Sequence, residues 1–323
     1  MFKKTLIITT LSVLALTACT IKTSDEPSAG QVADEKLKIV TTFAPLYSFA
    51  ANITGDLAEV ENLVPPGTSV HTWEPKASDL RAIAEADLLI MNGLDLEPFI
   101  DDMISSAQNS DLVVVKTHEA VEDYLMEMAE MVELGEDEHH DDHEEAHHDH
   151  HHGGQDPHIW LDPTMAMEQV NYISDTIISL DPANSEAYQA NTASYLESLQ
   201  NLDQEIKTAL AAAAPKDFIV FHGAYGYFLE HYGIAEYQRA SIEPFPGKEP
   251  TAAYFHGLVE LIEHDGVEVV FTEPQFSPRT VKNIQDETGI KSFEIDPIGL
   301  ELSSAAYENN LKSLSATFIK AFE

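Results

Sequence analysis

A long periodic segment, residues 184–214, most constrains how this chain of 323 residues can fold. Mostly apolar side chains recur in it at steps of three and four residues, so they share one face of an α-helix. These side chains are Tyr188, Thr192, Tyr195, Leu199, Leu202, Ile206 and Leu210. At about 1.5 Å per residue, the helix would be roughly 45 Å long. Because it lies near the middle of the chain, we predict that it connects two lobes.

Short apolar runs alternate with helical patterns on both sides of this segment. The runs lie at 37–42, 58–64, 87–92 and 112–116 before it, and at 218–222, 267–272 and 291–295 after it. Such alternation is typical of βα units, in which helices cover both faces of a mostly parallel sheet. We therefore predict an α/β fold with two such lobes, residues 37–183 and 215–323, joined by the helix at 184–214.

The N-terminus has the pattern of a bacterial secretion signal. Two lysines at positions 3 and 4 precede an apolar region, 6–16, which is too short to span a bilayer. Leu16-Thr17-Ala18-Cys19 follows and resembles a lipobox, which implies cleavage after residue 18 and lipidation of Cys19. Cys19 is the single cysteine, so no intramolecular disulfide can form. We predict a signal peptide at 1–18, a flexible tether at 19–36, and anchoring on the extracytoplasmic face of the cell membrane (periplasmic where an outer membrane exists).

The chain is strongly acidic. It carries 17 basic and 56 acidic side chains, which gives a formal net charge of −39. A surface of this charge repels nucleic acid and anionic lipid headgroups and attracts cations. Nucleic-acid binding is therefore not expected.

A histidine-rich run interrupts the first lobe. Eight histidines alternate with carboxylates: His139, His140, His143, His147, His148, His150, His151 and His152. The run has no apolar periodicity, which predicts a disordered surface loop over 136–154. Short histidine-rich tracts bind metal ions, so we interpret this loop as a low-affinity collector. The alternative is a solvated loop with no part in transport.

Four single side chains lie at or beyond the ends of predicted ordered segments: His71, His158, His222 and Asp296. Ligands of open α/β sheets bind beyond the carboxyl ends of the strands. Other histidines, such as His231, fall in helical stretches beside acids or aromatics and are expected to be exposed or hydrogen-bonded. Paired CxxC, P-loop and GxGxxG motifs are missing from the sequence, so ATP-binding and NAD-binding functions have no support.

Five segments, in this order, resemble those of one family. They are 65–67 with His71 and Glu74-Pro75, 156–163 (DPHIWLDP), 221–228 (FHGAYGYF), 272–275 (TEPQ) and 296–299 (DPIG). With them the chain is similar to the cluster A-I metal-binding proteins of bacterial ABC importers. The resemblance covers nearly all of the chain beyond the signal peptide. It implies a monomeric, non-enzymatic, two-lobed protein that binds a metal ion between the lobes and delivers it to an ABC permease and its ATPase.

The resemblance places the metal ligands on His71, His158 and His222, with the fourth at or near Asp296. Glu74 and Glu273 are alternatives for the fourth position or partners that orient a ligand, and a water could also fill it. Three imidazoles with one carboxylate or water suit tetrahedral Zn²⁺. Mn²⁺ prefers more carboxylates, and manganese-binding members of the family usually carry an acid at the position of His222. We therefore predict high-affinity zinc binding for uptake, with a manganese-specific member as the alternative.

Two other functions would use the same residues. A secreted zinc hydrolase would keep an open fourth position and use a glutamate such as Glu273 as general base. A structural or adhesive lipoprotein would bind the metal incidentally. An assay of turnover separates the first from a binding protein, and growth in zinc-depleted medium separates the second.

Overall fold

The computed structural model describes residues 36–128, 134, 154–243, 247, 248 and 250–323. The predicted signal peptide, Cys19 and the eight clustered histidines lie outside these residues, so the predictions on them stay predictions. Within the described ranges, no helix is both long and apolar enough to cross a membrane.

The N-terminal half forms a parallel four-stranded sheet in the order β2-β1-β3-β4. Its strands are β1 (Lys38–Thr41), β2 (Glu59–Asn62), β3 (Leu88–Met91) and β4 (Val113–Lys116). The helices of this half are α1 (Ala44–Thr54), α2 (Ala77–Glu85), α3 (Ile100–Ala107) and α4 (Pro163–Leu180). Every residue of the central strand β3 is buried, as expected for a parallel strand covered on both faces.

The C-terminal half repeats this topology with the order β6-β5-β7-β8, again all parallel. Its strands are β5 (Phe218–Val220), β6 (Gln238–Ser241), β7 (Val269–Thr272) and β8 (Lys291–Glu294). Its helices are α6 (Gly226–His231), α7 (Ala252–Asp265), α8 (Pro278–Thr288) and α9 (Ala306–Phe322). The edge strand β6 is absent from the sequence prediction, because Ala240 is its single apolar residue and its single buried one.

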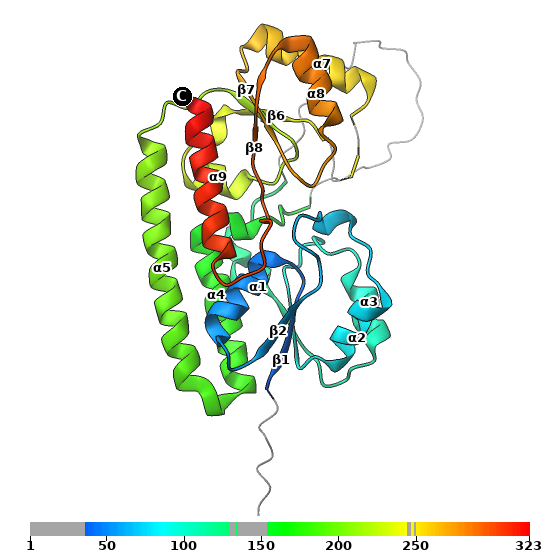
Figure 1. Cartoon of the computed structure of the whole chain (residues 1–323), viewed down its shortest axis with the longest axis vertical. Coiled ribbons are helices and arrows are strands. Elements are labelled where there is room, and N and C mark those ends of the chain that lie inside the picture. Colours follow the sequence, from blue (N-terminus) through cyan, green and yellow to red (C-terminus); the bar gives the residue numbers. More distant parts are fainter. Residues whose placement is uncertain (1–35, 129–133, 135–153, 244–246, 249) are drawn as a thin grey trace, which may run out of the picture. The chain divides into compact units, whose positions relative to one another are not determined.

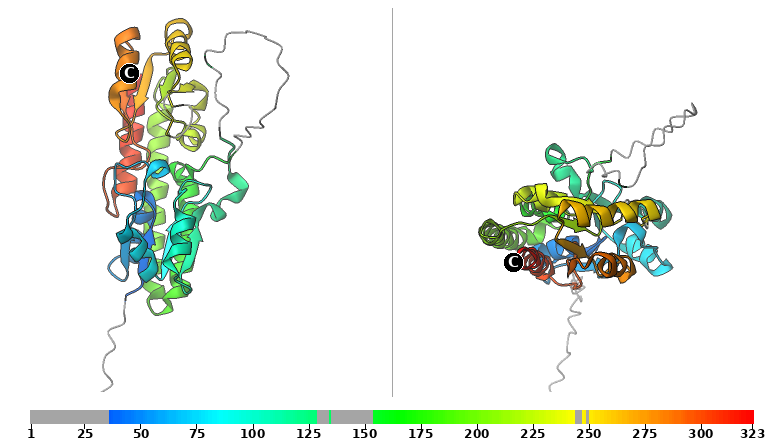
Figure 2. Two further views of the ribbon diagram at one scale, coloured as in Figure 1. Left: turned by 90° about the vertical axis from the view of Figure 1, so that its right-hand side faces the viewer. Right: turned by 90° about the horizontal axis from the view of Figure 1, so that it is seen from above.

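The predicted connecting helix is α5 (Ser185–Ala211), and all seven residues of its periodic stripe are buried. It packs against α1 and α4 of the first half and against α9 of the second, beside which it runs in both side views (Figures 1 and 2). The α/β class with two parallel sheets and one long joining helix is thereby confirmed. The residue boundaries of the two lobes stay a prediction.

An ion-paired histidine ties three helices together behind the sheets. His231, in α6, has its Nε2 2.7 Å from Asp203 Oδ1 of α5 and its Nδ1 3.4 Å from Asp162 Oδ2. Asp162 also caps α4 by accepting a hydrogen bond from the Thr164 backbone N–H. The hydrogen bond to Asp162 raises the pKa of His231 above 6.5, and Asp203 adds to the shift although burial opposes it. This histidine is hydrogen-bonded, as predicted for the helical histidines.

We expect His231→Gln to lower the free energy of unfolding by about 1–3 kcal/mol at pH 5.5, because two charge-assisted contacts are lost. The folded-state pKa of His231 lies above its unfolded value. Its stabilisation is therefore fully present below pH 6.5 and disappears as the pH rises through the folded-state pKa. Urea denaturation of metal-free protein at pH 5.5 and pH 9 measures the difference, with the exposed His256→Gln as control. An equal loss at both pH values would contradict this account.

Candidate metal centre

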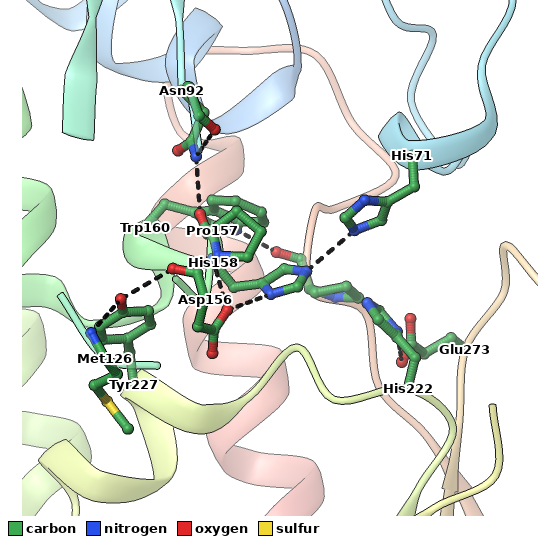
Figure 3. A network of polar contacts seen from close by, with 12 residues as sticks. His71, Asn92, Met126, Asp156, Pro157, His158, Trp160, His222, Tyr227 and Glu273 are labelled. Atoms are coloured by element: carbon green, nitrogen blue, oxygen red, sulfur yellow. Dashed lines mark hydrogen bonds and ion pairs between the residues drawn. The ribbon is translucent and has the colours of Figure 1, made fainter. Parts of the chain in front are cut away.

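Three imidazoles from distant parts of the chain meet at one point. His71, His158 and His222 each offer a ring nitrogen, and these atoms all lie within 4.8 Å of one another (Figure 3). The rings meet edge to face, with centroids 5.4, 6.1 and 5.3 Å apart. His71 Nε2 lies 3.3 Å from His158 Nε2, a contact drawn as a dashed line in Figure 3. Ring nitrogen atoms that converge in this way are typical of a metal site, for which neutral imidazole is the commonest ligand.

The parallel sheets explain why these histidines meet. His222 follows the end of β5 by two residues, and His71 lies in a 3₁₀ turn, Val70–Thr72, reached by the loop after β2. His158 immediately precedes another short 3₁₀ turn, Ile159–Leu161, at the start of the segment that leads into α4. Loops at the carboxyl ends of parallel strands share one edge of a sheet, so both sheets contribute to the same site.

Asp156 holds His158 in a fixed orientation. Its Oδ1 lies 2.6 Å from His158 Nδ1 and also accepts the His158 backbone N–H at 3.0 Å. Both side chains are buried. Because an ionised carboxylate only accepts hydrogen bonds, Nδ1 carries the proton and the lone pair of Nε2 faces the other histidines.

Glu273 does the same for His222 from the end of β7. Its Oε1 lies 2.7 Å from His222 Nδ1, and both side chains are buried. Burial lowers the pKa of His222, but Glu273, Glu243 and Asp156 together outweigh it and the net shift is upward. A carboxylate in this position increases the basicity of the ligand nitrogen. This contact suits a partner that orients His222, and the role of Glu273 at a metal site stays a prediction.

His71 is held differently. Its side chain is half-buried, and no carboxylate among the described residues pairs with it. Burial, together with the nearby His158 and His222, lowers the pKa of His71 to about 2. Its imidazole is therefore neutral at any physiological pH, as a metal ligand has to be.

A second layer of contacts holds the His158 loop on one side. The Asn92 side chain donates a hydrogen bond to the Pro157 carbonyl at 2.8 Å. Glu97 in turn accepts the backbone N–H groups of Asn92 and Gly93, at 2.7 and 3.1 Å. Burial raises the pKa of Glu97 to about 7 despite these hydrogen bonds.

Asn92, Glu97 and the role of Asp156 are absent from the sequence prediction. Only Asp156 has a local signal, because it lies two residues before a candidate ligand.

On the other side the same loop is tied to the C-terminal half. Trp160 Nε1 donates to the Pro297 carbonyl, and Tyr307 Oη donates to the Trp160 carbonyl, both at 2.7 Å. Trp160 packs edge-on against Phe43 and is fully buried. The pocket that the histidines share with these residues has a volume of about 10 Å³, close to the space of a single water. Its size suits a single ion.

Asp296, the predicted fourth ligand, is not a member of the cluster within 4.8 Å. Its Oδ1 accepts hydrogen bonds from Gln275 Nε2 at 2.7 Å and from the Ile298 backbone N–H at 2.9 Å. Its Oδ2 is buried without a hydrogen-bond partner among the described residues. Gln275 and Ile298 line the histidine pocket, so Asp296 contacts the pocket through these two hydrogen-bond partners. Direct coordination by Asp296 stays a prediction.

Glu74, the other predicted partner, is exposed, and it is not among the described residues that line the histidine pocket. A role for Glu74 at the metal site also stays a prediction.

Two parallel sheets, a connecting helix and converging imidazoles define a two-lobed protein with a candidate metal centre. The family model described as "Zinc-uptake complex component A periplasmic" matches residues 39–321. The chain belongs to this family. The resemblance stated from the sequence is thereby confirmed.

Two curated relatives are similar over most of this chain. The zinc-binding lipoprotein AdcA of Streptococcus pneumoniae is 31% identical over 326 residues, 98% of this chain and 61% of AdcA. The high-affinity zinc uptake system protein ZnuA of Bacillus subtilis is 34% identical over 294 residues, 90% of this chain and 88% of that protein. The chain thus spans less than two thirds of the length of AdcA.

Among solved structures, the SBP FpvC from Pseudomonas aeruginosa in complex with Mn²⁺ is 29% identical to this chain, with a TM-score of 0.75. The match covers 89% of this chain and 98% of FpvC. The two chains therefore share their fold over nearly the whole described region.

A substitution at Gly226 tests whether metal binding depends on the position of the Asp156 carboxylate. A Cβ added at Gly226 would lie 2.9 Å from Asp156 Oδ2, whereas one added at Gly223 would meet nothing within 4 Å. We expect Gly226→Ala to displace the carboxylate and weaken metal binding about 10- to 100-fold, as the loss of such a partner does elsewhere. Alanine favours α6, so thermal stability should not fall in parallel. Metal titration of both variants measures the effect, and equal affinities of Gly226→Ala and Gly223→Ala would contradict it.

Proposed function

We propose that this protein binds Zn²⁺ outside the cytoplasm with high affinity and delivers it to an ABC permease for uptake. The observation that carries the proposal is the convergence of His71, His158 and His222, with the first shielded from protonation and the other two each oriented by a buried carboxylate. The names of the similar proteins AdcA and ZnuA support zinc as the ion and uptake as the process.

The donor set favours zinc over manganese. Three imidazoles and one oxygen ligand match the tetrahedral preference of Zn²⁺, whereas Mn²⁺ prefers more oxygen ligands. The similar protein FpvC is in complex with Mn²⁺, which keeps manganese as the second candidate. A nitrogen ligand from His222, where manganese-binding members of the family usually carry an acid, argues against manganese.

Catalysis is not part of the proposal. The glutamate that a zinc hydrolase would use as base, Glu273, is buried and already hydrogen-bonded to His222. The similar curated proteins carry names of binding and uptake proteins, which supports a non-enzymatic role.

The proposal includes the parts of the chain outside the described residues. Lipidation of Cys19 would hold the protein at the extracytoplasmic face of the membrane, close to the permease and its ATPase. The name of the similar lipoprotein AdcA supports this anchor. The histidine-rich run, 136–154, would collect zinc weakly and pass it to the site, and the protein would act as a monomer.

We expect purified protein without an affinity tag to hold one tightly bound zinc ion per chain, and His158→Ala to hold none after dialysis. Removing one of three imidazoles and leaving Asp156 unpaired eliminates the tetrahedral donor set. Elemental analysis of both proteins measures the metal and identifies it. The exposed His256→Ala is the matched control. A variant that lacks 138–152 should keep the tight site, and manganese or no metal in the wild type would contradict the proposal.

Asp296→Asn tests the fourth ligand. Asparagine keeps the Oδ1 acceptor for Gln275 and Ile298 but removes the charge and the second carboxylate oxygen. If Asp296 coordinates the ion, we expect the zinc affinity to fall about 10- to 100-fold. Competition with a fluorescent chelator measures it, with Asp286→Asn on the exposed face of α8 as control. An unchanged affinity would assign the fourth position to a water or another carboxylate.

A further inference from the structure

A cavity of about 390 Å³ adjoins the histidine pocket. Ser69, Gln275 and Phe276 line both spaces, so the two are neighbours that share a wall. The histidine pocket is only about 10 Å³, and His158 and His222 are buried. The larger cavity therefore offers an ion from solvent one route toward the imidazoles.

The cavity has walls of two kinds. Phe221 and Phe276 stack with a centroid distance of 4.5 Å and form an apolar wall. Side chains with a hydroxyl or amide group also line the cavity: Thr68, Ser69, Thr72, Gln275, Ser277 and Thr280. Neutral oxygen atoms of this kind can hydrogen-bond to the water shell of a cation without binding it tightly.

Glu243 is the one carboxylate among the described residues that line the cavity. It follows the end of β6 by two residues, and its backbone N–H donates to the Phe221 carbonyl at 2.7 Å, which places it beside His222. Its Oε1 accepts the backbone N–H of Gly247 at 2.8 Å. Its Oε2 is buried and has no hydrogen-bond partner among the described residues. Glu243 as a whole residue is 7% exposed.

An orphaned carboxylate oxygen of this kind calls for a ligand, because buried polar atoms in folded proteins are normally paired. Burial raises the pKa of Glu243 to about 7, although the nearby His222 lowers it. Lys248 also lines the cavity and takes part in an interaction of its own.

We propose that Glu243 is a transit ligand, which binds the hydrated divalent cation in this cavity before the ion reaches the three histidines. The inference rests on the proposed zinc-binding function. A carboxylate on the route stabilises an intermediate position that is common to arrival and departure. It therefore accelerates both steps and leaves the final affinity nearly unchanged.

The test is stopped-flow kinetics of Zn²⁺ binding and chelator-induced release, with the full chain. Glu243→Gln keeps an acceptor for the Gly247 N–H, and we expect it to slow association and release alike, each on the order of tenfold, with nearly the same dissociation constant. Glu243→Asp keeps the carboxylate and should retain most of both rates. Glu263→Gln removes an exposed charge on α7, away from the cavity, and should change neither.

Two results would overturn the inference. Unchanged rates in Glu243→Gln would mean that the ion takes another route. Slower association with unchanged release, and a dissociation constant raised by the same factor, would mean that Glu243 acts only through long-range charge. Wild-type protein that binds no Zn²⁺ would instead overturn the proposed function, and the kinetic comparison would then not arise.

Discussion

The site depends on two buried hydrogen bonds between a carboxylate and an imidazole, Asp156 to His158 and Glu273 to His222. Three imidazoles within 4.8 Å cannot all be charged, and burial makes each charge more costly. The two carboxylates fix the protons on the outer nitrogen atoms and leave the inner lone pairs to meet. They also bring negative charge next to an ion that the low-dielectric interior would otherwise disfavour. Most other contacts of the site, including those of Asn92 and Trp160, hold these pairs in place.

Polar residues follow the ends of all four strands of the second sheet. Each of its four parallel strands is followed, within two residues of its end, by one side chain directed to the same edge: His222, Glu243, Glu273 and Asp296. Glu273 follows its strand by one residue and the other three by two, and the four side chains differ in burial and in partners. His222 is held by Glu273, Asp296 is held by Gln275, and Glu243 keeps one oxygen without a partner. One topological element thus provides a ligand, a partner that orients it and two acids beside the site.

Sequence reasoning recovers what periodicity and strand ends encode. The stripe of α5 and the alternation of strands and helices follow from local patterns. The convergence of His71, His158 and His222 was implied by the resemblance to the family, because these residues form no local motif. It fails where the signal is not local. β6 has one apolar residue and was missed, and the role of Glu243 behind it was missed with it. Glu97 acts across more than fifty residues through its hydrogen bond with Thr42, and no spacing rule identifies such a contact.

The three candidate ligands differ in their burial and in the contacts that hold them. His158 and His222 are buried and each is fixed by a carboxylate, while His71 is half-buried in a short turn without one. The loop of His158 is further tied to the C-terminal half through Trp160 and Pro297. Ser69, two residues before His71, lines both the histidine pocket and the larger cavity. The least constrained ligand therefore stands beside the open side of the site. An ion arriving from the cavity would meet two imidazoles that carboxylates orient, and the coordination set would be completed by His71, which contacts His158 but pairs with no carboxylate among the described residues.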